Sequence, residues 1–135
     1  MGRNLTSGTT ANVLIVRPQQ MSALVDARLS AFKSRLAVHI TEVLPEQAAA
    51  LGPAGLVAAI DRHVPEAMAL GLESEHDLAR YVDLAVTLGP AWRGDWTAPI
   101  LADSNLTPSD RITEIFIQLP LHVKGSQALS EWWAA

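Results

Sequence analysis

The chain has 135 residues, of which 49% are hydrophobic and 18% are charged, and its formal net charge is −4. This composition excludes a disordered chain, and a protein of this length can bury about two-thirds of its unfolded surface around one modest core. The ten Lys and Arg are scattered, so no basic stripe is present to bind nucleic acid. The absence of cysteine excludes disulfides and thiolate metal sites, which fits a cytoplasmic protein.

The first residues are expected to form an arm ahead of the helices. Residues 1–12 are rich in Ser, Thr and Gly, which predicts a flexible segment, and residues 13–17 are mainly apolar and β-branched, which favours a short strand-like segment. The apolar run is too short for the core of a signal peptide. No apolar run in the chain approaches the roughly 18 residues that cross a bilayer, so we expect no membrane insertion.

Residues 19–44 carry the clearest amphipathic pattern in the chain. Pro18 suits the first position of a helix because its φ angle is already helical. The apolar positions that follow recur at steps of three or four residues, and they are Met21, Val25, Leu29, Phe32, Leu36, Ile40 and Val43. The pattern predicts one long helix. Its apolar stripe can serve a core or a dimer, so a homo-oligomer is left open.

Residues 45–70 are expected to form two helices with a further irregularity. Gly52 is suited to end a short helix that begins at Pro45, and a second helix follows at once. Within that second helix Pro65 lacks a backbone donor and its ring clashes with the preceding turn. We therefore expect a kink or break near His63.

Residues 71–90, GLESEHDLARYVDLAVTLGP, contain a cap, an amphipathic helix and a stop. Gly71 suits the left-handed cap of the preceding helix, and Ser74 is a good N-cap for the next one. The acidic residues of the first turn are favourable against the helix dipole, and Gly89 before proline ends the helix. The buried stripe is expected to comprise Leu78, Tyr81, Val82, Ala85 and Val86.

The last third of the chain alternates irregular and helical segments. Residues 91–103 contain two tryptophans with Pro and Gly, which predicts a loop over the core followed by a turn of helix. Thr107 and Pro108 are typical of a helix start, and we expect this helix to end at Pro120. From about residue 121 the chain is either a short helix or a mobile tail. The predicted fold is all-α: one compact bundle of five to six helices over residues 13–135.

The histidines do not show the spacing of a metal site. His39, His63, His76 and His122 lie on separate predicted elements, and no pair has the i, i+4 spacing of a helical zinc site. His76 is expected to be solvated, and His63 to be partly buried with a backbone partner. We predict no metal and no cofactor.

Motifs for catalysis and for nucleic-acid binding are also missing from the sequence. Cysteine, a G-x-S-x-G elbow and a Walker loop are all absent, and the carboxylates of ESEHD are explained by the helix dipole. A helix-turn-helix drawn over residues 57–88 would have an acidic second helix that repels DNA. A Ser/His/Asp triad assembled by the fold is left as the only catalytic alternative, and we predict that the chain is not an enzyme.

The tryptophans are the best candidates for a binding surface. Trp92, Trp96, Trp132 and Trp133 are large, amphipathic residues in irregular or terminal segments, so we predict that they contact a partner protein. Trp132 and Trp133 are adjacent and cannot point the same way on a helix. Either one of them is exposed as an anchor, or both clamp the tail to the domain.

Three segments resemble a group of small helical proteins from bacterial type VI secretion gene clusters. The segments are VLIVRPQQMSAL, GLESEHDLARYVDLAVTLGP and the later Trp with ILAD, and together they cover most of residues 13–103. Pro65 departs from the pattern of this group, and residues beyond Leu106 have no counterpart in it. The matching positions are Gln20, Met21, Gly71, Leu72, Glu75, Asp77, Tyr81, Gly89, Trp96, Ile100, Leu101 and Asp103.

The resemblance implies a non-enzymatic co-chaperone or adaptor in the bacterial cytoplasm. Proteins of this kind look like accessory factors that help to load a toxic effector onto the secretion spike, and their partner is an effector or its adaptor. A cytoplasmic immunity protein that neutralises an effector is the alternative of similar size and acidity. A small hydrolase with a histidine site assembled by the fold is the alternative from another class.

Overall fold

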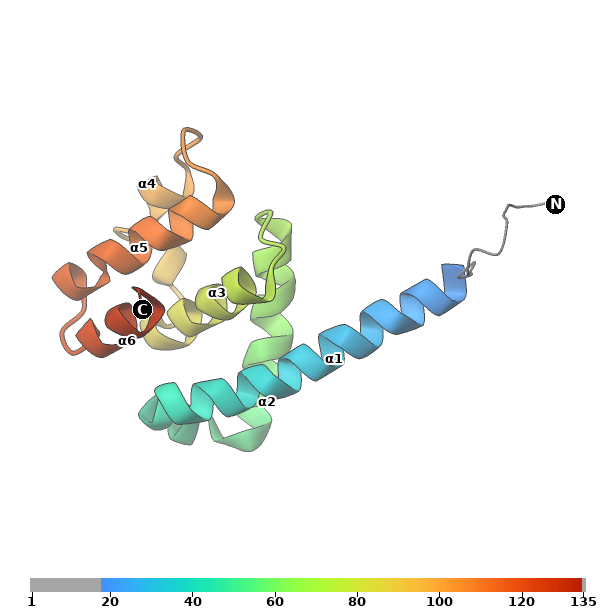
Figure 1. Cartoon of the computed structure of the whole chain (residues 1–135). Helices are drawn as coiled ribbons and strands as arrows, with labels where there is room; N and C mark the ends of the chain where they lie inside the picture. The colour runs from blue at the N-terminus through green and yellow to red at the C-terminus, as the bar shows by residue number, and fades with distance from the viewer. Residues whose placement is uncertain (1–17, 135) are drawn as a thin grey trace. The chain divides into compact units, whose positions relative to one another are not determined.

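In the computed structural model, residues 18–134 are described, and they form six α-helices and one 3-10 helix without a strand (Figure 1). The predicted all-α class is confirmed. The flexible arm of residues 1–12, the strand-like residues 13–17 and the side chain of Met21 lie outside what is described. The elements are α1 (Pro18–Val43), α2 (Pro45–Ala69), α3 (Glu75–Leu88), η1 (Trp92–Gly94), α4 (Ala98–Leu101), α5 (Pro108–His122) and α6 (Gln127–Ala134).

The predicted long helix is present as α1, and the chain divides into two compact units within it. The first unit comprises residues 1–32 and the second residues 33–135. In the first unit the side chain of Val25 is 60% exposed, whereas Leu36 and Ile40 in the second unit are buried. The prediction of a single domain from residue 13 stays a prediction. Within residues 18–134, no helix has both the length and the apolar content needed to cross a membrane.

Helix α2 contains the predicted break at Gly52 but not the one expected near His63. Gly52 has φ 73° and ψ 168° and is the one residue inside α2 with non-helical angles. The break expected near His63 is absent, because the backbone angles around Pro65 stay helical. Val64 and Ala67, on either side of the proline, are fully buried, while Pro65 itself is exposed. The packing of both neighbours in the core offsets the single backbone hydrogen bond that Pro65 cannot donate.

Helix α3 is the centre of the second unit, between α2 and α5 (Figure 1). At its start the Ser74 hydroxyl accepts a hydrogen bond from the Asp77 N–H at 3.0 Å, and at its end Gly89 is the C-cap. Gly71 has φ 92°, and a Cβ there would lie 3.1 Å from the Pro108 ring, so both backbone and space favour glycine. The six consecutive residues 80–85 are all buried.

Helix α5 continues past the proline at which we expected it to end. It extends to His122, and the expected stop at Pro120 is wrong. Pro120 cannot donate to the carbonyl oxygen of Phe116, but the Ser130 hydroxyl from α6 donates to that oxygen at 2.8 Å. Of the two alternatives for the end of the chain, the structure shows the short helix. Leu129 of α6 is buried, which places α6 against the core.

Candidate functional site

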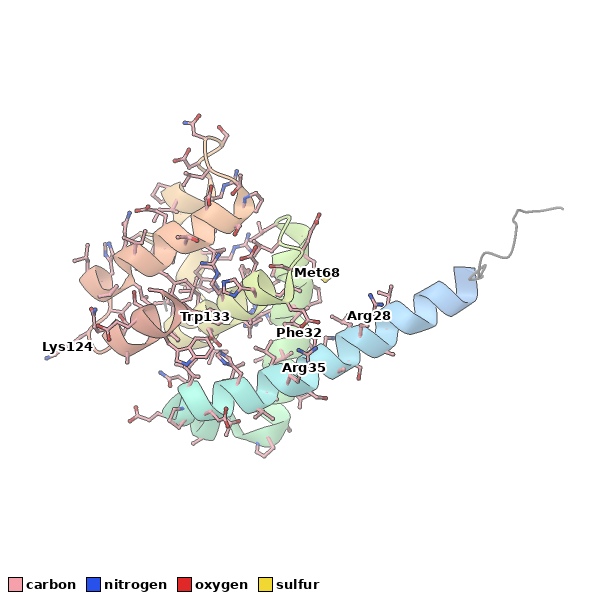
Figure 2. All side chains as sticks on the ribbon, viewed as in Figure 1. Arg28, Phe32, Arg35, Met68, Lys124 and Trp133 are labelled. Carbon is pink, nitrogen blue, oxygen red and sulfur yellow. The ribbon has the colours of Figure 1, made fainter. Side chains whose placement is uncertain are left out.

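A buried carboxylate links the last helix to two others. Asp83 of α3 is completely buried, and its Oδ2 lies 2.6 Å from Nε2 of His39 on α1. The indole N–H of Trp133 on α6 donates to the same oxygen at 2.9 Å. Figure 2 shows the Trp133 side chain in the space between α6, α3 and the second half of α1. One oxygen atom therefore joins side chains that lie 44 and 50 positions away from it in the sequence.

The charge of Asp83 is only partly compensated. Burial raises the pKa of Asp83 above its usual value of 3.8, and the hydrogen bonds to His39 and Trp133 offset only part of this rise. The second oxygen, Oδ1, is buried and has no hydrogen-bond partner. A buried carboxylate of this kind becomes much more costly when either of its donors is removed.

Trp132 lies on the outer side of this cluster. Its side chain is 48% exposed, yet its ring makes an edge contact with Trp133 at 4.7 Å between centroids and another with His39 at 4.8 Å. His76 is exposed, as expected, and its ring adds an edge contact to Trp133 at 5.1 Å. Because Trp133 is fixed by Asp83, Trp132 is presented to solvent on a rigid support.

A cleft lies beside Trp132, between the end of α1 and α6. It has a volume of about 390 Å³ and is lined by Val43 and Leu129 as well as by the polar residues His39 and Glu42. An apolar lining with one carboxylate and one imidazole suits an apolar or basic side chain from another protein. We refer to Trp132 and this cleft together as the C-terminal surface.

The four predicted contact residues do not gather at one place. Trp132 and Trp133 are brought together at the C-terminal surface. Trp92 is buried in the core, with its ring 5.2 Å from that of Tyr81, and Trp96 is half-buried and stacks on His122. A contact role for Trp92 and Trp96 stays a prediction, and the buried Trp92 offers a partner little surface.

The remaining histidine interactions differ from what the sequence indicates. His63 is partly buried, but its partner is a side chain, with Nδ1 2.8 Å from Oε1 of Glu66, so the expected backbone partner is wrong. This hydrogen bond is the main reason why the pKa of Glu66 lies below its usual value. Residues 18–134 contain no group of three or more His, Asp and Glu that could hold a metal ion.

Sequence reasoning did not identify Asp83 or its pairing with His39. The available signal is a carboxylate at position 83 between the apolar residues Val82 and Leu84, in a helix that also carries a full apolar stripe. A charge in such a place indicates a buried helix with a polar partner on another element. Which element provides the partner depends on the tertiary packing.

The His39 and Asp83 pair has the geometry of a base held by a carboxylate, and it joins α1 to α3. In the described part of the chain, no hydroxyl group is hydrogen-bonded to His39, and the second neighbour of Asp83 is an indole N–H. Together with Trp133, the pair links α1, α3 and α6. No protein-family model matches this chain, and no curated protein and no solved structure is detectably similar to it.

Proposed function

We propose that the chain is a non-enzymatic protein-binding accessory factor, an adaptor or co-chaperone that helps to load a toxic effector onto a bacterial type VI secretion spike. The C-terminal surface is the contact region for the effector or its adaptor. The observation that carries the binding role is the half-exposed Trp132 on its rigid support. The secretion context comes from the resemblance of residues 13–103, and the acting compartment is the bacterial cytoplasm.

The rigidity of Trp132 favours binding because little side-chain entropy is left to lose. Tryptophan is enriched among the residues that dominate binding energy, and such residues are usually next to a cleft that accepts a partner side chain. Trp132 satisfies both conditions, since two rings support it and the cleft of about 390 Å³ lies beside it. Other exposed apolar residues, such as Val57, do not line this cleft.

The charge of the surface indicates the chemistry of the partner. Glu42 lines the cleft, and the whole chain carries a net charge of −4. Electrostatic complementarity then favours an apolar patch with basic residues around it on the effector or its adaptor. Such a partner would place an apolar side chain against Trp132 and a basic one near Glu42.

Replacing Trp132 by alanine tests this surface. The partner is first obtained by affinity capture of the chain at native level from a bacterium that carries it, followed by mass spectrometry. We expect Trp132→Ala to lower the affinity at least tenfold, which corresponds to about 1.4 kcal/mol. Val57→Ala on α2 removes a side chain that is 55% exposed and should leave the affinity unchanged. Equal, small effects of both substitutions would exclude the C-terminal surface as the contact region.

A co-expression assay separates the loading role from the immunity alternative. When the captured effector is produced together with this chain, a loading factor leaves its toxicity intact, and deletion of the chain abolishes export of the effector. Protection of the producing cell would instead establish an immunity protein. That outcome would overturn the loading role even if Trp132 is the contact residue.

A further inference from the structure

A second aromatic cluster lies where η1 meets the end of α5, separate from the C-terminal surface. It borders a cleft of about 540 Å³ whose lining includes Trp92, Trp96, His122 and Asp95. Trp96 and His122 are stacked, with ring centroids 4.2 Å apart and an interplanar angle of 7°. The helices and their caps would form without aromatic residues at this cleft, so the fold alone does not explain why they are there.

The rings of this cleft are held in place by the core. Trp92 is buried and makes an edge contact with Tyr81, and its carbonyl oxygen accepts a hydrogen bond from the hydroxyl of the buried Thr97. The turn that carries Trp96 is thereby tied to the segment that carries Trp92. Indole rings present a negative quadrupole at their faces, which attracts cations.

The cleft also contains a carboxylate that has no side-chain partner among the described residues. Asp95 is exposed, and its side chain makes no hydrogen bond or ion pair within residues 18–134. The neighbouring cation Arg93 is directed elsewhere, since its Nη1 donates to the Tyr81 hydroxyl at 3.3 Å. Lys124, at the turn after α5, extends outward and does not line the cleft (Figure 2). Within residues 18–134, the negative charge of Asp95 is therefore left uncompensated beside the indole ring of Trp96.

We propose that this cleft binds an alkylammonium group, with the cation against the face of the Trp96 indole opposite His122 and its charge balanced by Asp95. Indole faces attract lysine ammonium groups and quaternary ammonium groups such as choline, and a nearby carboxylate adds a favourable charge interaction. The net charge of −4 favours the approach of a cation. The ammonium group can belong to a small molecule such as choline or to a lysine of another protein. The proposal does not depend on the function of the C-terminal surface.

The test uses the whole chain and two probes of nearly equal shape. Choline carries the charge, and its neutral carbon isostere dimethylbutanol does not. The readout is the set of four indole N–H signals in a nitrogen-correlated NMR spectrum, assigned by single Trp→Phe substitutions. We expect choline to shift the Trp96 signal in a saturable way and to bind at least tenfold more tightly than dimethylbutanol. Equal responses to both probes, or no saturable shift with choline and with lysine derivatives, would overturn the proposal.

Two variants and two further probes sharpen the result. Asp95→Asn changes an exposed side chain and should weaken choline binding at least threefold, whereas Trp132→Ala should leave it unchanged. Unchanged binding in Asp95→Asn would contradict the role of the carboxylate. In the last experiment choline is replaced by lysine methylamide that is acetylated at its α-amino group. Its side-chain ammonium group is either free or trimethylated. Tighter binding of either lysine derivative than of choline assigns the site to a protein partner, and the reverse order assigns it to a small molecule.

Discussion

The two tryptophan clusters of this chain contain the same residue types and differ in the position of the carboxylate. Beneath the C-terminal surface, Asp83 is completely buried and is hydrogen-bonded to His39 and Trp133. At the cleft between η1 and the end of α5, Asp95 is exposed and has no side-chain partner within the described residues. Burial therefore decides whether the carboxylate holds the fold together or is available to a ligand.

The largest difference between the clusters should appear when each carboxylate is removed. Asp83→Ala leaves two partly buried donors, on His39 and Trp133, without their acceptor, and we expect it to lower the free energy of unfolding by about 3 kcal/mol. Asp95→Ala removes an exposed side chain and should change it by less than about 0.5 kcal/mol. Urea unfolding followed by circular dichroism measures both values. If the two substitutions lower the free energy of unfolding by similar amounts, the proposed contrast between the buried and the exposed carboxylate is wrong.

A smaller effect is expected when only the indole donor is removed. Trp133→Phe keeps an aromatic ring in the cluster but takes one hydrogen bond from Asp83, so we expect a loss of about 1.5 kcal/mol. Amide hydrogen exchange should be faster in α6 than in the wild-type chain, because α6 would lose one of its ties to α3. Trp132→Phe is the matched control, since the Trp132 indole makes no hydrogen bond within residues 18–134. If amide hydrogen exchange in α6 is unchanged in Trp133→Phe, the contacts of Leu129 and Ser130 are enough to keep α6 packed on the core.

Local signals in the sequence predicted much of the fold because caps and periodicity act within a few residues. The bounds of α1, the break at Gly52 and the cap at Ser74 follow from such signals. The break expected near His63 and the stop expected at Pro120 are absent because tertiary packing compensates for each proline. At Pro120 the compensation is visible, since Ser130 donates to the carbonyl oxygen that the proline leaves unpaired.

The candidate sites were harder to predict, since they depend on contacts between distant elements. An amphipathic pattern assigns one buried stripe to α3, yet residues 80–85 are all buried, including Arg80 and Asp83. The tryptophans were recognised as candidates by their type and placement. That Trp132 is exposed while Trp92 is buried follows from how η1 and α6 pack, which the spacing of the residues does not specify.

The smallest expected effect concerns pH and separates Asp83 from Asp77, a carboxylate near the start of α3. Burial raises the pKa of Asp83 in the folded chain above 3.8, so the folded state retains a proton that the unfolded state has lost. The stability that Asp83 contributes is therefore present below pH 3.8. It declines as pH rises from 3.8 through the higher pKa of Asp83 in the folded chain. Burial alone would also raise the pKa of Asp77, but hydrogen bonds from Arg80 and Ser109 bring it below its usual value. Its contribution has the opposite sign and is lost as pH falls.

Difference curves test this pair of carboxylates. The free energy of unfolding is measured between about pH 3 and pH 7 for the wild-type chain, Asp83→Asn and Asp77→Asn. Subtracting each variant from the wild type cancels the titration of the other groups that do not contact the changed residue. We expect the Asp83 difference to fall as pH rises above 3.8 and the Asp77 difference to rise over the acidic range. If both differences rise with pH, Asp83 is stabilised as a charged partner of His39 to a greater degree than its burial opposes, and the carboxylate is an ordinary buried ion pair.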